Sequence, residues 1–464
     1  MDNLTGINKD IAPNFIFPLP KDEISIGDLE DKSLILNFEG GNISSDAGAL
    51  LLKEVEEQIG LIRAIAGVIP DNRDARYVRH TLTDLLIQRV AQIACGYEDA
   101  NDCNDLRNDP IFKMLAGRYP EIGDALASQP TMSRFENTIS RTTLYRIAIV
   151  FADVFIASYD TPPSVIVIDF DDTEDKVHGN QQQSLFNGYY GNYCFMPLHV
   201  YEGLSGKLIT TILKPGKRSD GQEMHSIVKR IVDYLRDKWP ETLIIFRGDG
   251  HFSYPEVMDY IEETDDAKYV VGLSTNSRLL KDADATIKRA VKMYEESGNK
   301  VVLFHSFYYQ AGSWNNPRRV VVKVEVSELG KNIRFIVTDM EAAKATVLYK
   351  EIYCARGEDE LYIKDHKLYL KSDRTSCHKF EANQFRLFLH SAAYVLIHTL
   401  KTEILGETSF AKANFDTIQL NILKVGARVR ELKTRIKIEL PTSFPLKNTI
   451  IRSFQIFNCL RSPG

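Results

Sequence analysis

The 464-residue sequence has few cysteines, and none of them lie close together. Its six cysteines are scattered along the chain without any Cys-x-x-Cys pair. Structural zinc sites and disulfide frameworks both need closely spaced or regularly paired cysteines, so this pattern argues against either kind of site. We expect free thiols.

Long apolar runs and an excess of positive charge are also missing. No stretch of about 18 uninterrupted apolar residues occurs, and the N-terminus lacks a basic region followed by an apolar core, so we expect a cytosolic protein with no membrane partner. The formal net charge of -6 at pH 7 gives no overall attraction to nucleic acid. Any contact with DNA must therefore come from local basic patches.

What remains is the composition of an ordinary globular protein, with 44% hydrophobic and 26% charged residues. At roughly 150 residues per domain, the length allows two to four units. The apolar spacing is helical through most of residues 1–160, with long helices predicted at about 74–95 and 142–158.

One short stretch of this helical region has features of a DNA reader. Residues 129–133 (QPTMS) predict a turn in front of a short helix that presents Arg134 and Asn137 outward. This resembles the entry to the recognition helix of a helix-turn-helix motif. A plain helical hairpin is an equally good interpretation.

Strands dominate from residue 161 onward. Residues 164–171 (SVIVIDFD) form a buried apolar run, and 193–201 and 207–214 follow as two further strands. Strands and helices then alternate. Three adjacent strands followed by such an alternation predict a mixed α/β sheet over residues 161–275.

Residues 276–345 break the alternation with one helix and three β-rich segments, which predict an antiparallel insertion. Its predicted tip carries Trp314, Arg318 and Arg319. An aromatic ring beside two cations can stack on a base and hold a phosphate. An ordinary hairpin loop is the simpler interpretation.

Helices return over residues 346–420, and the C-terminal segment 421–464 contains the most basic patch of the chain. Arg428 and Arg430 lie in this patch. Its other cations are Lys424, Lys433, Arg435 and Lys437, opposed only by Glu431 and Glu439. Such a cluster can contact phosphates, and binding would then fall with salt. A solvated surface segment is the alternative.

Carboxylates gather at predicted strand ends. Asp169, Asp171 and Asp172 end the first strand of the sheet, and Asp249 comes two residues after a later strand. Metal-dependent phosphodiester chemistry needs carboxylates that converge from distant parts of the sequence on a rigid frame. Because side chains alternate along a strand, Asp169 and Asp171 share one face, and the spacing leaves both as candidates.

The segment 346–371 predicts a helix with a distinctive charge pattern. Tyr353, Arg356 and Glu360 are separated by three and four residues and fall on one stripe, and Lys367 follows. By itself this describes a solvated helix with salt-bridge spacing. Beside two strand-end aspartates, Glu360 becomes the third candidate carboxylate.

Two strand-end aspartates and a helical glutamate on a mixed sheet constitute the layout of a ribonuclease-H-like nuclease. The Tyr-x2-Arg-x3-Glu-x6-Lys spacing from Tyr353 to Lys367 resembles DDE transposases of bacterial insertion sequences, in the group called the thirteen-eighty type. The stretches Asp171-Asp172-Thr173, Asn187 to Gly191 and Arg247-Gly248-Asp249 also resemble that group. The resemblance runs from about residue 34 to about residue 440.

The resemblance implies an α/β fold with a ribonuclease-H-like mixed-sheet core, interrupted by the β-rich insertion and preceded by a helical DNA-binding and dimerisation region. Asp171, Asp249 and Glu360 would form the catalytic triad that binds Mg²⁺, for which Mn²⁺ can substitute. The family's Asp-x-Thr pattern selects Asp171 over Asp169, because Thr173 then falls in place.

DNA contacts follow from the same resemblance. Arg356 and Lys367 would hold phosphate oxygens, Tyr353 would position Arg356 or stack near the DNA end, and Trp314 would stack on a base. Further candidate DNA contacts are Arg134, Arg318, Arg319, Arg428 and Arg430.

The implied protein is a bacterial, cytoplasmic transposase, associated with the nucleoid when it is bound to DNA. It would bind terminal inverted repeats, cut the element ends and join the 3'-hydroxyls to target DNA, as a homodimer assembled on DNA. The alternatives are a metal-dependent DNA nuclease without strand transfer and a catalytically silent DNA-binding regulator.

Overall fold

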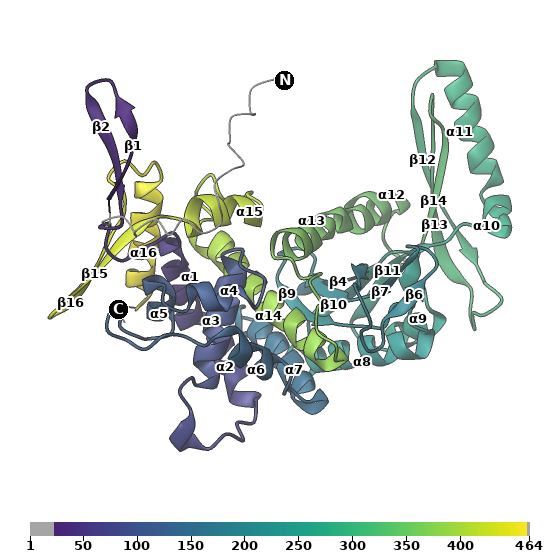
Figure 1. Cartoon of the computed structure of the whole chain (residues 1–464). Helices are drawn as coiled ribbons and strands as arrows, with labels where there is room; N and C mark the ends of the chain where they lie inside the picture. Colours follow the sequence, from purple (N-terminus) through teal and green to yellow (C-terminus); the bar gives the residue numbers. More distant parts are fainter. Residues whose placement is uncertain (1–22, 462–464) are drawn as a thin grey trace, which may run out of the picture.

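The computed structural model describes residues 23–461, apart from the side chains of residues 358 and 359. The predicted regions 1–160 and 421–464 therefore extend beyond the described residues at their outer ends. A large mixed sheet and the helices around it make up most of the chain (Figure 1). Within the described range, no helix is long and apolar enough to cross a membrane.

The large sheet has eight strands in the order β12-β13-β14-β11-β10-β4-β8-β9. Their bounds are β4 (Val165–Asp172), β8 (Leu198–Glu202), β9 (Leu208–Ile212), β10 (Leu243–Gly248), β11 (Ala267–Leu273), β12 (Val301–Tyr309), β13 (Arg318–Ser327) and β14 (Gly330–Thr338). β4, β10 and β11 run parallel to one another, and the remaining neighbours pair antiparallel. The predicted mixed α/β fold is confirmed.

The central strands β4 and β10 begin with apolar residues, and their charged residues come in the C-terminal half of each strand. In β4 the residues from Ile166 to Phe170 are buried, and the two last residues, both aspartates, are partly exposed. The parallel register places Arg247 of β10 beside Asp169 of β4. Asp249 follows β10 at the edge where Asp171 and Asp172 end β4, so the fold brings the two strand ends together.

The strands of the predicted insertion continue the central sheet, because β14 pairs with β11 from Val270↔Thr338 to Leu273↔Phe335. Helices α10 (Ser277–Asp282) and α11 (Asp284–Ser297) precede β12. The loop 310–317 lies at the end of the ribbon nearest the core, since Arg319 pairs with Thr338. The far end is formed by the β13–β14 turn (Figure 1). The predicted tip around Trp314 is therefore wrongly placed.

Helices of the N-terminal part and helices from the second half of the chain, chiefly α14, share a hydrophobic core. The N-terminal helices are α1 (Leu50–Ile59), α2 (Leu61–Val68), α3 (Leu82–Ala94), α4 (Asp102–Leu106), α5 (Pro110–Leu115), α6 (Gln129–Glu136) and α7 (Arg141–Ala157). They pack with α14 (Phe380–Thr399), whose side chains are nearly all buried. A second core fills the space between the sheet and helices α8 (Gly221–Lys238) and α9 (Pro255–Glu262).

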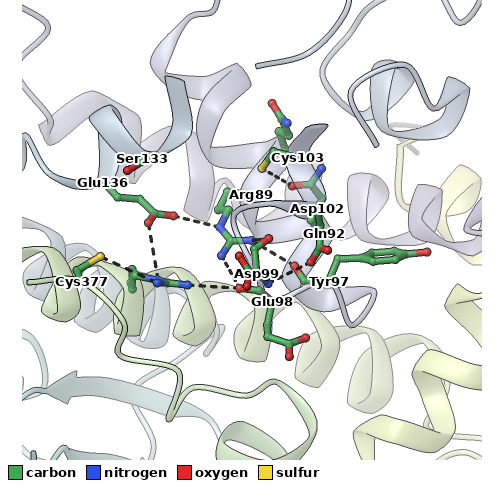
Figure 2. A network of polar contacts seen from close by, with 12 residues as sticks. Arg89, Gln92, Tyr97, Glu98, Asp99, Asp102, Cys103, Ser133, Glu136 and Cys377 are labelled. Atoms are coloured by element: carbon green, nitrogen blue, oxygen red, sulfur yellow. Dashed lines mark hydrogen bonds and ion pairs between the residues drawn. The ribbon is translucent and has the colours of Figure 1, made fainter. Parts of the chain in front are cut away.

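A buried polar network ties this helical region to α14 (Figure 2). The Arg89 guanidinium is fully buried; its Nε donates to Glu136 Oε1 at 3.1 Å and its Nη2 donates to the Glu98 carbonyl at 2.6 Å. Arg386 of α14 approaches the other oxygen of Glu136 at 3.7 Å. Since a buried carboxylate is stable only when it is paired, Glu136 fixes α6 against both α3 and α14.

Three smaller sheets complete the chain. β1 (Glu23–Leu29) pairs with β2 (Lys32–Asn37) as an isolated hairpin, and β5 (Asp175–Lys176), β6 (Leu185–Asn187) and β7 (Asn192–Phe195) form a second small sheet. The third has the order β16-β15-β3, from β3 (Ile43–Ser44), β15 (Ala427–Leu432) and β16 (Arg435–Glu439). Helices α15 (Phe415–Ile418) and α16 (Lys447–Arg461) lie on either side of β15–β16 in the sequence.

Candidate active site

Three aspartates end β4, and each one meets a different cation. Asp169 pairs with Arg247 of β10, and Asp172 pairs with Lys214, whose Nζ lies 2.7 Å from Asp172 Oδ1. Asp171 pairs with Arg356 across 2.8 Å. These partners separate the roles of the three carboxylates.

The Asp169–Arg247 pair is part of the interior. Both side chains are at most 1% exposed, and the guanidinium donates to both oxygens of Asp169. Its Nη1 also donates to the Ile352 carbonyl at 2.6 Å, which attaches the segment carrying Tyr353 to the sheet. Gly203 is required beside this pair, because a Cβ there would lie 2.0 Å from Asp169 Oδ2. Asp169 is therefore enclosed, and Asp171 is the strand-mate that reaches the surface.

Asp171 and Thr173 are contacted by two members of the Tyr-Arg-Glu-Lys pattern. Arg356 Nη2 donates to Asp171 Oδ2 at 2.8 Å, and Lys367 Nζ donates to Thr173 Oγ1 at 2.9 Å. Lys367 also bonds the Glu174 carbonyl and lies 4.0 Å from the buried Asp175. Residues almost two hundred positions apart thus meet at the end of β4.

The electrostatic environment of Asp171 disfavours its charge. Burial raises the pKa of the Asp171 carboxyl to about 7, against the opposing effect of Arg356, and the nearby carboxylates of Asp249 and Asp172 add to the rise. Crowded carboxylates of this kind are common where a cation or a proton is bound.

Asp249 lies at the end of β10, in front of a short turn. Its carboxylate accepts from the His251 backbone N–H at 2.8 Å, and its side chain is about one-third exposed. Tyr353 packs close to this turn: a Cβ on Gly272 would lie 2.8 Å from the Tyr353 hydroxyl and 2.6 Å from the Gly250 nitrogen. Burial raises the pKa of the Tyr353 hydroxyl. Gly272 thus permits the tyrosine and the Asp249 turn to meet over β11.

The segment 346–371 is helical but is not one α-helix. It begins with α12 (Ala345–Val347), a π-helix (Leu348–Tyr353) and a 3-10 helix (Cys354–Glu358), and continues with α13 (Asp359–Lys364) and a second π-helix (Asp365–Tyr369). A 3-10 helix turns about 20° more per residue than an α-helix, so the predicted stripe is rotated after Arg356. Glu360, on α13, is exposed.

The predicted carboxylate triad is therefore brought together only in part. The parallel strand ends place Asp249 close enough to Asp171 for its charge to act there, and Glu360 is exposed on α13. Among the side chains that the structure describes, which leave out residues 358 and 359, no three from His, Cys, Asp or Glu gather closely enough to hold a metal ion. The chemistry of the Asp171–Asp249 pair nevertheless fits a hard divalent cation, because crowded carboxylate oxygens are the ligands such ions prefer.

Trp314 and Arg318 are buried, contrary to their predicted place at an exposed tip. The Trp314 ring is 6% exposed and packs on Tyr309 with ring centroids 5.5 Å apart, and the Arg318 guanidinium lies 5.2 Å from it. Arg318 also pairs with Asp259 and Glu262 of α9. A ring held in this way is not presented for stacking on a base, because it anchors the loop 310–317 to the core.

The remaining predicted DNA contacts differ in their surroundings. Arg134 is exposed on α6, which begins at Gln129, so the predicted turn at 129–133 is already helical. Arg319 donates to the carbonyls of Met340 and Glu341. Arg428 is exposed on β15, and Arg430 pairs with Glu439 across the β15–β16 hairpin.

The sequence did not reveal two partners of these carboxylates. They are the cations Arg247 and Lys214, which pair with Asp169 and Asp172. Arg247 directly precedes Gly248-Asp249 at the end of a buried strand, and a charge at such a position is a signal that a partner faces it. Lys214 carries no comparable signal, because a lysine at the end of a strand is ordinarily exposed to solvent.

Family comparison agrees with this geometry. Residues 27–462 match the model of the family described as transposase DDE domain group 1. The chain belongs to this family. DDE transposases act on DNA with the help of divalent metal ions, and the match includes both strand ends and the Tyr-Arg-Glu-Lys segment.

Among solved structures, the DDE transposase chain is similar to the piggyBac transposase in a synaptic complex with hairpin DNA. The identity is 13%, the TM-score is 0.41, and the similarity covers 81% of this chain and 80% of that chain. This similarity is too distant to add to the argument. No curated protein matches the chain.

Proposed function

We propose that this DDE transposase binds the terminal inverted repeats of an insertion sequence, cleaves the element ends and joins the freed 3'-hydroxyls to target DNA. The observation that carries the proposal is the meeting of Asp171 and Thr173 with Arg356 and Lys367. Two hydrogen bonds join the motif at the end of β4 to the segment that carries Glu360. This juxtaposition supports a phosphoryl-transfer site in a family of transposases.

Asp171 and Asp249 would hold Mg²⁺ or Mn²⁺, with Glu360 as the third carboxylate once α13 turns toward them. A bound divalent ion supplies activation of water and stabilisation of the leaving oxygen. Arg356 holds the Asp171 carboxylate in the DNA-free protein and exchanges this partner for a phosphate oxygen when DNA is present, since its planar fork suits either group. Lys367 supplies a point charge beside Thr173.

Buried residues around these groups hold Arg356 and the two aspartates in position. Arg247 links Asp169 to the Ile352 carbonyl, so the segment with Tyr353 and Arg356 is held in register with β4 and β10. Tyr353 packs over Gly272 beside the Asp249 turn. Small displacements of reacting groups cost large factors in rate, so this framework contributes to catalysis without touching DNA.

Joining of ends distinguishes strand transfer from simple cleavage. Pre-cleaved element ends would be incubated with a supercoiled plasmid and Mg²⁺, and we expect covalent joining of the 3'-hydroxyls to the plasmid. Cleavage of uncut ends without any joining would identify a nuclease. Specific end binding with neither reaction would identify a regulator.

A dimer assembled on DNA is part of the same proposal, because two element ends must be cut and joined together. Arg134 is our candidate for contact with the inverted repeat, since it is exposed on a short helix. An Arg134→Gln variant should bind end DNA more weakly and with a shallower salt dependence. Unchanged binding would remove α6 from the DNA interface.

A further inference from the structure

The β1–β2 hairpin is unusually exposed for a folded element. Every residue of both strands is exposed, and the hairpin forms a sheet of its own. Large apolar side chains with 40–81% exposure are Ile24, Ile26, Leu29, Leu34, Ile35, Leu36 and, directly after β2, Phe38. An isolated hairpin is marginal in water, and a contiguous exposed apolar surface marks an interaction site.

Both faces of the hairpin are apolar. Ile24 pairs with Leu36 and Ser25 pairs with Ile35, so neighbouring residues of β2 place large side chains on opposite faces. One covering surface of the same chain would bury only one face. A strand that is apolar on both sides is stable when it joins a larger sheet or is enclosed between two surfaces.

The charge of the hairpin identifies the chemistry of its partner. Residues 23–39 contain five carboxylates and a single cation: Glu23, Asp28, Glu30, Asp31 and Glu39, with Lys32. This balance repels phosphate and argues against a DNA contact. The partner must offer a basic surface and an open sheet edge.

The β15–β16 hairpin has both properties. β16 is an edge strand of its sheet within the described residues, since the strand order is β16-β15-β3. Its neighbourhood carries the cations Arg428, Arg430, Lys433, Arg435 and Lys437, and Leu432 is 40% exposed. Edge strands with open backbone groups accept an added strand.

We propose that the β1–β2 hairpin of one copy adds to the β16 edge in a second copy, with its carboxylates facing the cations of β15–β16. The β1–β2 and β15–β16 hairpins point in different directions (Figure 1), so each copy offers a donor and an acceptor. Two-fold symmetry makes both contacts at once. The residues between β2 and β3 include Gly40 and Gly41, which allow the hairpin to change its direction. This proposal rests on the proposed function, which needs two subunits, and adds that the two copies are already joined through this interface before DNA is bound.

The mass of the DNA-free full-length protein tests the interface separately from cleavage. Light scattering after size exclusion should give twice the 52.7 kDa chain mass. Replacing Ile35 and Leu36 by Asp should raise the dimer dissociation constant by about 100-fold or more, since two anchors are lost. Leu329→Asp is the matched control, because Leu329 is 94% exposed at the far turn of the β13–β14 ribbon, and it should leave the dimer intact.

A charge-reversal mixture decides between a specific contact and a folding defect. The variant Lys433→Glu/Arg435→Glu and the variant Glu30→Lys/Asp31→Lys should each be monomeric alone. Mixed together, they should form a heterodimer, because each reversed surface then meets its complement. Restored mass in the mixture supports the proposal.

Several outcomes would overturn it. A monomeric wild-type protein excludes the second copy as partner, and a dimer that survives the Ile35/Leu36 double replacement excludes the hairpin. A dimer unaffected by the Lys433/Arg435 reversal, with end-DNA binding lost instead, would assign β15–β16 to DNA. Each of these results is independent of whether the protein joins DNA ends.

Discussion

Replacement of Asp169 by Asn should unfold the protein far more readily, although the change removes only a charge. The Arg247 guanidinium is fully buried and donates to both oxygens of Asp169, whereas Asn offers a single acceptor and turns an amide donor toward the second N–H. The buried cation is then left without a counter-charge. Removing one partner of such a pair costs about 3–5 kcal/mol in the free energy of unfolding.

The strand-mate Asp171 is the matched comparison. Burial and neighbouring carboxylates raise the pKa of Asp171 to about 7, so its charged form opposes folding at neutral pH. Asp171→Asn removes this charge and should leave the free energy of unfolding equal to or higher than that of the wild type, while cleavage of element ends is lost.

Urea unfolding followed by far-UV circular dichroism measures both variants. We expect a midpoint well below wild type for Asp169→Asn and a midpoint at or above wild type for Asp171→Asn. A double variant, Asp169→Leu with Arg247→Met, should recover much of the lost stability, because no buried charge remains. The reasoning would be refuted if Asp169→Asn kept wild-type stability, or if Asp171→Asn were the destabilised variant.

Three further predictions follow from single contacts. Arg356→Lys should lower the cleavage rate by about 10–100-fold at unchanged stability, because a lysine cannot form the planar fork; a wild-type rate would contradict this. Trp314→Ala should lower the free energy of unfolding by about 3–5 kcal/mol in urea unfolding, since the ring is buried. If the variant instead lost cleavage and kept full stability, the predicted DNA contact of Trp314 would be supported. Burial lowers the pKa of His398 from its ordinary value of 6.5 to about 3. Below pH 6.5 the unfolded state therefore binds a proton at this side chain that the folded state does not bind, and the contribution of His398 to stability falls by about 2 kcal/mol from pH 7.5 to 5. A His398→Gln variant should show a flatter pH dependence in the same unfolding assay.

Features with a strong local signal could be read from the sequence. The run from Val165 to Asp172 has only apolar residues before its aspartates, which is the pattern of a central strand with a polar end. The two strand-end aspartates at 171 and 249 follow from that pattern and from parallel pairing. The Asp-x-Thr pattern predicts Asp171 as the candidate carboxylate, and the burial of Asp169 against Arg247 is a physical reason for the same choice.

The types and boundaries of the helices were harder to predict from the sequence, because they depend on tertiary contacts. The predicted helix at 74–95 is wrong at its start: a capping box between Thr81 and Asp84 begins α3 at Leu82. That box was a readable signal. No local signal marks the change from π-helix to 3-10 helix before Glu360.

Long-range partners could not be predicted from spacing. Trp314 is followed in the sequence by two asparagines and two arginines, which suggest a solvent-exposed tip, yet Arg318 pairs with Asp259 and Glu262 of α9. The strand β1 could not be predicted from the sequence, because Gly27 and the acidic turn at Glu30 reduce the strand propensity of this segment.

The most direct test of the proposed chemistry is cleavage of an element-end duplex by Glu360→Gln. Glu360 is the member of the predicted triad that the structure leaves exposed. We predict that end binding stays near normal while cleavage falls by at least about 1000-fold, and that Glu351→Gln, an exposed change in the same segment, has no effect. Cleavage at the wild-type rate by Glu360→Gln would contradict the assignment of the triad.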